Sequence, residues 1–183
     1  FSFPRTKWTM NSLNSRHFAA SSSSAVVSTE TSEIIHLPTN EDSNELVKIR
    51  HTSAHVLAMA VQKLFPDMQV AIGPWIDNGF YYDFSSPKNE AFCEADLKNI
   101  KKAMVDIIKK DLPLRLETVT REEARERILL LNEPYKLEIL DSIPSDEPIT
   151  IYHIGNEWWD LCAGPHVEST GQLVAKAIEL QSI

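Results

Sequence analysis

Two short motifs, far apart in the chain, each carry a pair of side chains that can hold a metal ion or activate a water molecule. The first is His51-Thr-Ser-Ala-His55 and the second is Cys162-Ala-Gly-Pro-His166. Together they supply three imidazoles and one thiol, the number and kind of ligands that suit one tetrahedral metal site. About 105 residues separate the motifs. Only a folded domain that brings them together can therefore make them one site.

Each motif alone has an ordinary structural explanation. Two histidines four residues apart share one face of a helix, and such pairs are more often surface or satisfied pairs than sites. A buried cysteine is usually a small apolar residue. Gly164-Pro165 fixes a sharp turn that can aim His166 back toward Cys162. Taken together, the four residues favour a functional cluster, and they make zinc a possible ligand.

Asp160 and Lys136 are two further candidates. Asp160 lies two residues before Cys162, so on a strand the two side chains share a face. A carboxylate there can fix the tautomer of a histidine, although an ordinary exposed aspartate fits equally well. Lys136 can stabilise an oxyanion or hold a phosphate. On spacing alone, a solvated lysine is the simpler interpretation of that residue.

Composition limits the function classes. The chain has 183 residues and 43% hydrophobic residues, which suits one domain with extensions, and it contains no apolar run that could span a membrane. Its two cysteines make no disulfide framework, which favours a reducing compartment. Net charge is -8, and residues 1–29 hold three bases and no acid. The remaining 15 bases and 26 acids give -11, so the body is no general nucleic-acid binder and contacts RNA, if at all, at one end.

Residues 1–29 have the composition of an organellar transit peptide, being rich in serine, bearing arginine and lacking acids. A merely disordered tail is the alternative. Residues 30–42 are expected to be a linker, and residues 43–183 the folded domain. The one basic group in that domain is a set of lysines on one expected helix, which a solvated helix face explains: Lys98, Lys101, Lys102, Lys109 and Lys110.

Hydrophobic periodicity and turn signals predict both helices and strands. Asn78-Gly79 predicts a tight hairpin, and Thr120 with Glu123 predicts a capping box at the start of a helix. The expected helices are 43–65, 91–110 and 121–131, with a short helical turn at 135–140. The expected strands are 69–75, 80–84, 112–119, 149–154, 158–161 and 173–180. The order lacks the regularity of strand–helix–strand units, so the prediction is an α+β fold with helices packed on an antiparallel sheet. On the first helix, His51 and His55 lie roughly opposite the apolar stripe and are expected to face solvent or a cleft.

Three longer segments resemble a known family. They are Arg50–His55, the run Ala71-Ile-Gly-Pro-Trp-Ile-Asp-Asn-Gly-Phe-Tyr-Tyr-Asp83, and Trp159–His166. In this order they resemble the editing region of threonyl-tRNA synthetase, of plant organellar or bacterial type. The resemblance covers about residues 43–183. Alanyl-tRNA synthetases and their free-standing deacylase relatives share the two short motifs, while the middle segment favours the threonyl branch.

The resemblance implies a single editing domain that hydrolyses serine from mischarged tRNA(Thr), with the acceptor end of that tRNA as partner. Serine lacks one methyl group of threonine, and such a difference gives a binding pocket only about 1–3 kcal/mol of discrimination. Water activation would fall to His51, His55 and His166, and shaping of the pocket to Cys162. Asp160 would orient a histidine or bind the substrate amine, and Lys136 would offset charge on the tetrahedral intermediate.

The resemblance also implies properties of a parent enzyme. That enzyme attaches threonine to tRNA(Thr) with ATP through a class II catalytic core and is expected to be a homodimer in a mitochondrion or chloroplast. This chain carries no glycine-rich nucleotide motif, so ATP is expected only in the ligase core outside it. Zinc is used by the alanyl relatives and stays open for this chain.

Three alternatives remain from the sequence. One is a free-standing deacylase that acts on tRNA charged elsewhere. Another is a non-catalytic remnant that binds tRNA acceptor ends without turnover. The last is a structural domain stabilised by zinc, which a chelator would unfold.

Overall fold

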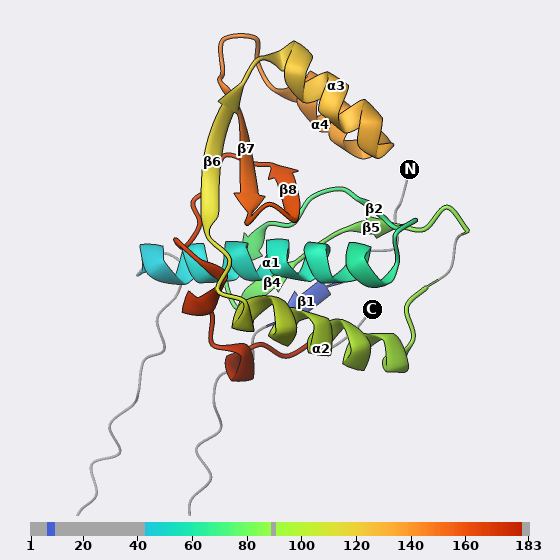
Figure 1. Ribbon diagram of the computed structural model, residues 1–183, viewed down its shortest axis with the longest axis vertical. Helices are drawn as coiled ribbons and strands as arrows, with labels where there is room; N and C mark the ends of the chain where they lie inside the picture. The colour runs from blue at the N-terminus through green and yellow to red at the C-terminus, as the bar shows by residue number, and fades with distance from the viewer. Residues whose placement is uncertain (1–6, 10–42, 89–90, 181–183) are drawn as a thin grey trace, which may run out of the picture.

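Helices and antiparallel sheets fold together in this chain, as the computed structural model shows for residues 7–9, 43–88 and 91–180. Two long helices lie side by side in one half, and a three-stranded sheet rises from them to a second pair of helices (Figure 1). The predicted α+β class is therefore confirmed. The site motifs lie where the two halves meet.

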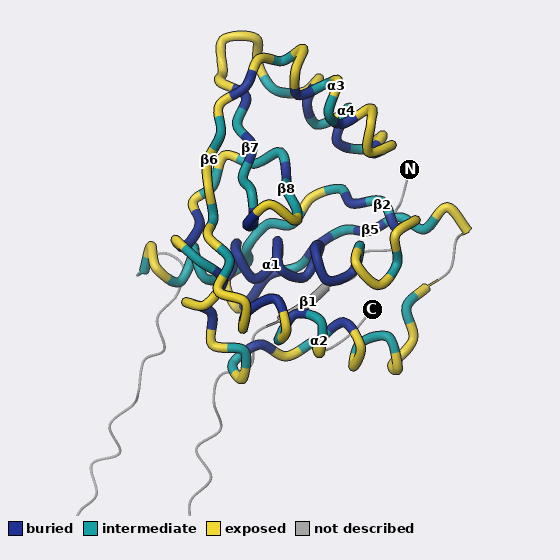
Figure 2. The backbone as a smooth tube through the Cα atoms, viewed as in Figure 1, coloured by how far each residue is buried: buried dark blue, intermediate teal, exposed yellow. Residues whose placement is uncertain are grey.

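The centre of the molecule is helix α1 (Asn44–Leu64). Ser43 caps it, because its hydroxyl oxygen accepts the Leu46 N–H at 3.2 Å. Every residue from 50 to 61 is buried, as the dark tube in Figure 2 shows. Helix α2 (Glu94–Lys109) packs along α1 through Ile100, Met104 and Ile107. This pair forms most of the larger hydrophobic core.

Short strands cover another side of α1. Strand β3 (Trp75–Ile76) and strand β4 (Gly79–Tyr81) form the hairpin that Asn78-Gly79 predicted. Strand β2 (Gln69–Val70) pairs with strand β5 (Phe84–Ser85). The two longer strands expected at 69–75 and 80–84 are thus broken into four. Arg50 fastens the hairpin to α1 by donating to the carbonyls of Ile76 and Asp77 at 3.3 and 2.7 Å.

The second half is an antiparallel sheet covered by two helices. Its strands are β6 (Leu114–Val119), β7 (Ile149–Ile154) and β8 (Trp158–Leu161), in that order. Helix α3 (Arg121–Leu131) begins with the predicted capping box of Thr120 and Glu123, and helix α4 (Pro134–Ser142) lies against it. Ala124, Ile128, Leu140 and residues of β6 and β7 form a smaller core between them.

Some sequence predictions are wrong in detail. Residues 173–180 contain no strand but a single turn of 3-10 helix, η2 (Ala175–Ala177). Another such turn, η1 (Thr170–Gln172), directly precedes them, and both turns contact α2. The second helix starts at Glu94, and α4 is a full helix instead of one turn. The lysines of α2 are also not all solvated, because Lys101 donates to the carbonyl oxygens of Ala175 and Ile178.

The expected transit peptide and linker lie almost wholly outside the described residues. The exception is strand β1 (Lys7–Thr9), which pairs with β4 and falls within the expected transit peptide. Both assignments stay predictions. Among the residues that the structure describes, no helix has the length and apolar character needed to cross a membrane.

Candidate functional site: a buried histidine–cysteine cluster

The two motifs meet inside the protein. Cys162 Sγ lies 3.4 Å from His51 Nε2 and 3.3 Å from His166 Nε2. The rings of His51 and His166 stack with centroids 4.0 Å apart, and the ring of His55 lies 4.3 Å from that of His166. The structure therefore brings together four of the six candidate residues, over the chain separation that the sequence analysis required.

His51 and His55 are buried and do not face bulk solvent, but both line the pocket beside the cluster, as expected for residues that face a cleft. They are 6% and 2% exposed. The larger core covers the apolar side of α1, and the segment after β8 covers the histidine side. A helix enclosed on all sides cannot be recognised from its own apolar stripe, because the covering residues come from elsewhere in the chain.

The turn after β8 places His166 as the sequence predicted. Gly164 has a φ of 77°, and a Cβ atom there would lie 2.8 Å from the Tyr152 hydroxyl oxygen. Glycine is therefore required by both conformation and space. The Gly164 N–H donates to Cys162 Sγ at 3.2 Å. The carbonyl oxygen of Pro165 accepts a hydrogen bond from His51 Nδ1 at 3.1 Å, so the turn also orients the first motif.

Burial keeps the cluster uncharged. Desolvation lowers the pKa of His51 and of His166, and lowers the pKa of His55 well below its usual value. Desolvation likewise raises the pKa of the Cys162 thiol to about 12. At neutral pH the site holds three neutral imidazoles and a thiol. Because the thiolate is the nucleophilic form, this environment does not activate Cys162 as a nucleophile.

Asp160 and Lys136 also belong to the site, but they bond mainly to each other. Their buried side chains form an ion pair. The other carboxylate oxygen, Oδ2, accepts from the Tyr82 hydroxyl at 2.5 Å and lies 3.6 Å from His55 Nε2. Asp160 thus links Lys136 to the histidine cluster. The interpretation of Lys136 as a solvated lysine was wrong.

Tyr82 is the residue that sequence reasoning missed. It packs as an aromatic core residue, being fully buried with its ring against Gly73. Its hydroxyl nevertheless bonds Asp160 and lies 3.5 Å from Lys136 Nζ. Burial, together with the Asp160 charge, raises the Tyr82 pKa well above its usual value, so the hydroxyl stays a donor. The sequence feature that could have identified Tyr82 as a site residue is its position in the segment Ala71–Asp83, which resembles the threonyl family.

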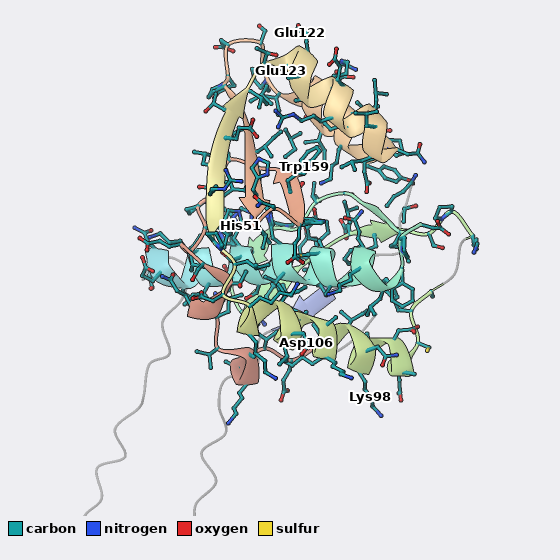
Figure 3. All side chains as sticks on the ribbon, viewed as in Figure 1. His51, Lys98, Asp106, Glu122, Glu123 and Trp159 are labelled. Carbon is teal, nitrogen blue, oxygen red and sulfur yellow. The ribbon has the colours of Figure 1, made fainter. Side chains whose placement is uncertain are left out.

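A pocket of about 300 Å³ opens beside the cluster. His51 lies where α1 passes beside the β6–β8 sheet (Figure 3). The polar residues that line the pocket are His51, His55, Asp160 and Cys162, while its other walls come from residues 71–75, Ile139 and Leu161. Lys136 and His166 are not among the lining residues. The size and mixed lining suit a small ligand that carries polar groups.

The four motif residues can hold a metal ion. Their candidate ligand atoms all lie within 4.8 Å of one another. In a tetrahedral zinc site the ligand atoms are about 3.3–3.6 Å apart, so the Cys162 contacts already fit and the widest pair would have to close by about 1 Å. His55 Nδ1 is buried without a hydrogen-bond partner among the described residues. The donor chemistry fits zinc.

Comparison with known proteins supplies the family. Residues 149–183 match the family model described as the threonyl and alanyl tRNA synthetase second additional domain. The chain is 63% identical over 164 residues to the chloroplastic/mitochondrial threonine–tRNA ligase 2 of Arabidopsis thaliana, covering 90% of this chain and 24% of that protein. Over this length, the chain belongs to the threonyl-tRNA synthetase family.

Bacterial members of the family are equally similar. The chain is 64% identical over 149 residues to the threonine–tRNA ligase of Thermosynechococcus vestitus, which covers 81% of this chain and 24% of that protein. Identity to the Synechocystis enzyme is 61% over 158 residues, or 86% of this chain and 25% of that protein. The chain therefore spans about a quarter of the length of these relatives in the threonyl-tRNA synthetase family.

Proposed function

We propose that residues 43–183 form an editing domain that hydrolyses the ester between serine and tRNA(Thr). The observation that carries the proposal is the convergence of His51, His55, Cys162 and His166 beside a pocket of about 300 Å³. Family membership supports a substrate in which an amino acid is esterified to tRNA.

His55 is the base in this proposal. Its Nδ1 is buried without a hydrogen-bond partner in the described chain, and its Nε2 faces Asp160. Burial keeps the imidazole neutral, so the Nδ1 lone pair is available at neutral pH. A water oxygen attacks the ester carbonyl carbon while His55 Nδ1 takes its proton. The same proton then passes to the leaving ribose oxygen, and the products are serine and tRNA with a free hydroxyl group.

The contacts of Asp160 support a role in orienting His55. Lys136 binds one carboxylate oxygen, and Tyr82 binds the other on the side that faces His55. With both oxygens engaged, the carboxylate has little capacity left for a substrate amine. Lys136 is not among the residues that line this pocket, which favours a role in holding Asp160 in place over direct contact with the tetrahedral intermediate.

In this proposal, the walls of the pocket select serine over threonine. The walls of the pocket include Gly73, Pro74, Trp75 and Ile139. Gly73 packs on Tyr82 so closely that a Cβ atom would lie 2.1 Å from the ring, so this wall has no room to retreat. A fixed wall excludes an additional methyl group by overlap, which a flexible wall would accommodate. Cys162 lines the same space as a neutral thiol.

Zinc, where it binds, would be held by His51, His55, Cys162 and His166, and it would supply Lewis-acid polarisation of water or of the ester carbonyl. The chain would have to give up the Cys162 proton to bind it, because a thiol with a pKa of about 12 is protonated at neutral pH. Release of about one proton per zinc, measured by calorimetry in buffers of different ionisation enthalpy, is the signature of binding through this thiol.

The remaining properties are proposed for the parent enzyme. We assign to it the ATP-dependent attachment of threonine to tRNA(Thr), a homodimeric state and a mitochondrial or chloroplast location. The Arabidopsis relative is a chloroplastic/mitochondrial threonine–tRNA ligase, which supports the location, while the relatives from Thermosynechococcus and Synechocystis are bacterial. Residues 1–29 are proposed as the transit peptide and 30–42 as the linker.

The proposal is tested by measuring release of serine from seryl-tRNA(Thr) by the 183-residue chain and by two variants. His55→Gln removes the proposed base and is expected to lower the rate by about a hundredfold or more. Lys98→Gln alters an exposed residue of α2 and should leave the rate unchanged. Equal rates for His55→Gln and the wild-type chain would overturn the proposal, whereas tRNA binding without turnover by the wild-type chain would favour the non-catalytic alternative.

A further inference from the structure

Thr52 lies inside the first motif and contacts the second. It is fully buried. Its hydroxyl oxygen lies 3.1 Å from His166 Nδ1 and accepts the Val167 N–H at 3.2 Å. This residue therefore touches both the ring of a site histidine and the backbone that follows it, and the proposed mechanism gives it no task.

The contact between His51 and the Pro165 carbonyl oxygen fixes which atoms of the cluster carry hydrogen. His51 Nδ1 faces the carbonyl oxygen of Pro165 at 3.1 Å. A carbonyl oxygen only accepts, so Nδ1 carries the hydrogen of this neutral ring. The other nitrogen, His51 Nε2, is consequently a bare lone pair, and it faces Cys162 Sγ at 3.4 Å.

The single hydrogen of the Cys162 thiol then has one place to go. It must lie toward His51 Nε2, since otherwise two lone pairs would face each other in a buried site. With that hydrogen used, the contact between Cys162 Sγ and His166 Nε2 at 3.3 Å needs a hydrogen from the ring. His166 is therefore protonated at Nε2 and donates to sulfur.

His166 Nδ1 is left as an acceptor, and the Thr52 hydroxyl is the partner that the structure places beside it. Because Val167 N–H already donates to the Thr52 oxygen, the hydroxyl hydrogen is free to point at the ring. The hydrogen bonds thus run in one direction, from the Val167 amide through Thr52, His166, Cys162 and His51 to the Pro165 carbonyl.

We propose that Thr52 is a positioning residue that holds His166 in the Nε2–H tautomer in the metal-free protein. The consequence for catalysis rests on the proposed function. The lone pairs of His51 and His166 are both engaged in this chain of hydrogen bonds, so His55 Nδ1 is the one unengaged imidazole lone pair of the cluster. The Thr52 hydroxyl thereby occupies the His166 Nδ1 lone pair, so that this lone pair does not compete with His55 as the base.

The test reads the tautomers directly. The 183-residue chain, labelled with 15N at histidine and freed of metal by chelator, is examined at pH 8 by two-bond 1H–15N correlation NMR. This experiment distinguishes a nitrogen that bears hydrogen from a bare one, and the His51→Gln and His166→Gln variants assign the two rings. The expected result is Nδ1–H for His51 and Nε2–H for His166. An Nδ1–H tautomer for His166 overturns the proposal without any variant of Thr52.

Two matched variants test the assignment to Thr52. Thr52→Val keeps the shape and removes the hydroxyl, so His166 is expected to lose its single tautomer and show a mixture. Thr52→Ser keeps the hydroxyl and should restore the Nε2–H tautomer. With seryl-tRNA(Thr), Thr52→Val is expected to lower kcat by about tenfold to a hundredfold with KM little changed, and Thr52→Ser to recover most of it.

The two measurements distinguish failure of the proposed role of Thr52 from failure of the proposed function. A wild-type chain that shows the expected tautomers but hydrolyses no seryl-tRNA(Thr) would reject the proposed function and keep the role of Thr52 in the cluster. Hydrolysis together with an unchanged His166 tautomer in Thr52→Val would reject the role of Thr52 and keep the proposed function. If Thr52→Val does not fold, the wild-type and Thr52→Ser spectra still decide the tautomer.

Discussion

Lys136 and Asp160 form an ion pair inside the protein, with side chains 2% and 5% exposed. Lys136 is contributed by α4 and Asp160 by β8, so the pair joins the helical layer to the strand that carries the site. Breaking such a pair leaves an uncompensated buried charge, which typically costs about 3–5 kcal/mol. We therefore expect Lys136→Met to lower the free energy of unfolding by about that amount in urea titrations.

The design of that experiment includes its own controls. Lys98→Met, on the exposed face of α2, should change the free energy of unfolding by less than about 0.5 kcal/mol. The double variant Lys136→Met/Asp160→Asn removes both charges and should recover a large part of the loss. If the double variant loses as much free energy of unfolding as the two single variants lose together, the two charges are not coupled and the ion pair is contradicted.

The two cysteines should differ sharply in reactivity. Cys162 is largely buried with a pKa of about 12, whereas Cys93 is exposed. At pH 8 a thiol with that pKa is only about one part in ten thousand thiolate, the form that alkylating agents attack. We expect iodoacetamide to label Cys93 at least about tenfold faster than Cys162, as measured by peptide mass spectrometry. Equal labelling in the folded, metal-free chain would show that the thiol is not held neutral.

Stability should fall as the medium becomes acidic. The pKa values of His51, His55 and His166 are lowered by burial below the value of about 6.5 expected in the unfolded chain. Below pH 6.5 the unfolded chain therefore binds protons that the folded chain does not. Above pH 6.5 the histidines are neutral in both states and cost no free energy of unfolding. As pH falls below 6.5, the free energy of unfolding decreases by up to about 1.4 kcal/mol per pH unit for each histidine.

This dependence is measured by urea unfolding of the metal-free chain between pH 7.5 and 5. His166→Gln removes one of the three groups while leaving the carboxylates unchanged, so its stability should fall less steeply with acid than that of the wild-type chain. Identical slopes for the two proteins would mean that His166 is charged or accessible in the folded state.

Local sequence patterns were sufficient for most of the helices, for the strands of the β6–β8 sheet and for the meeting of the two motifs. The capping box at Thr120, the turn at Asn78-Gly79 and the loop at Gly164-Pro165 each depend on a few neighbouring residues, and each is present in the structure. The convergence of the two motifs was predicted from their ligand types, because ligands so far apart in the chain can act as one site only if the fold brings them together.

What the sequence did not reveal depends on partners distant in the chain. Lys136 is buried because Asp160, 24 residues later, compensates its charge. Tyr82 is a hydrogen-bond donor to the same carboxylate, 78 residues away. The apolar residues around Leu173 favoured a strand by composition, but they pack on α2 as single helical turns. No local pattern specifies such contacts.

The most direct test of the account is selectivity in ester hydrolysis. The 183-residue chain is incubated with seryl-tRNA(Thr) and, separately, with threonyl-tRNA(Thr), and the loss of each ester is followed above its spontaneous rate. We expect rapid loss of serine and little loss of threonine, with both rates reduced to background in His55→Gln. Equal loss of both amino acids, or no loss of serine from a chain shown to be folded, would contradict it.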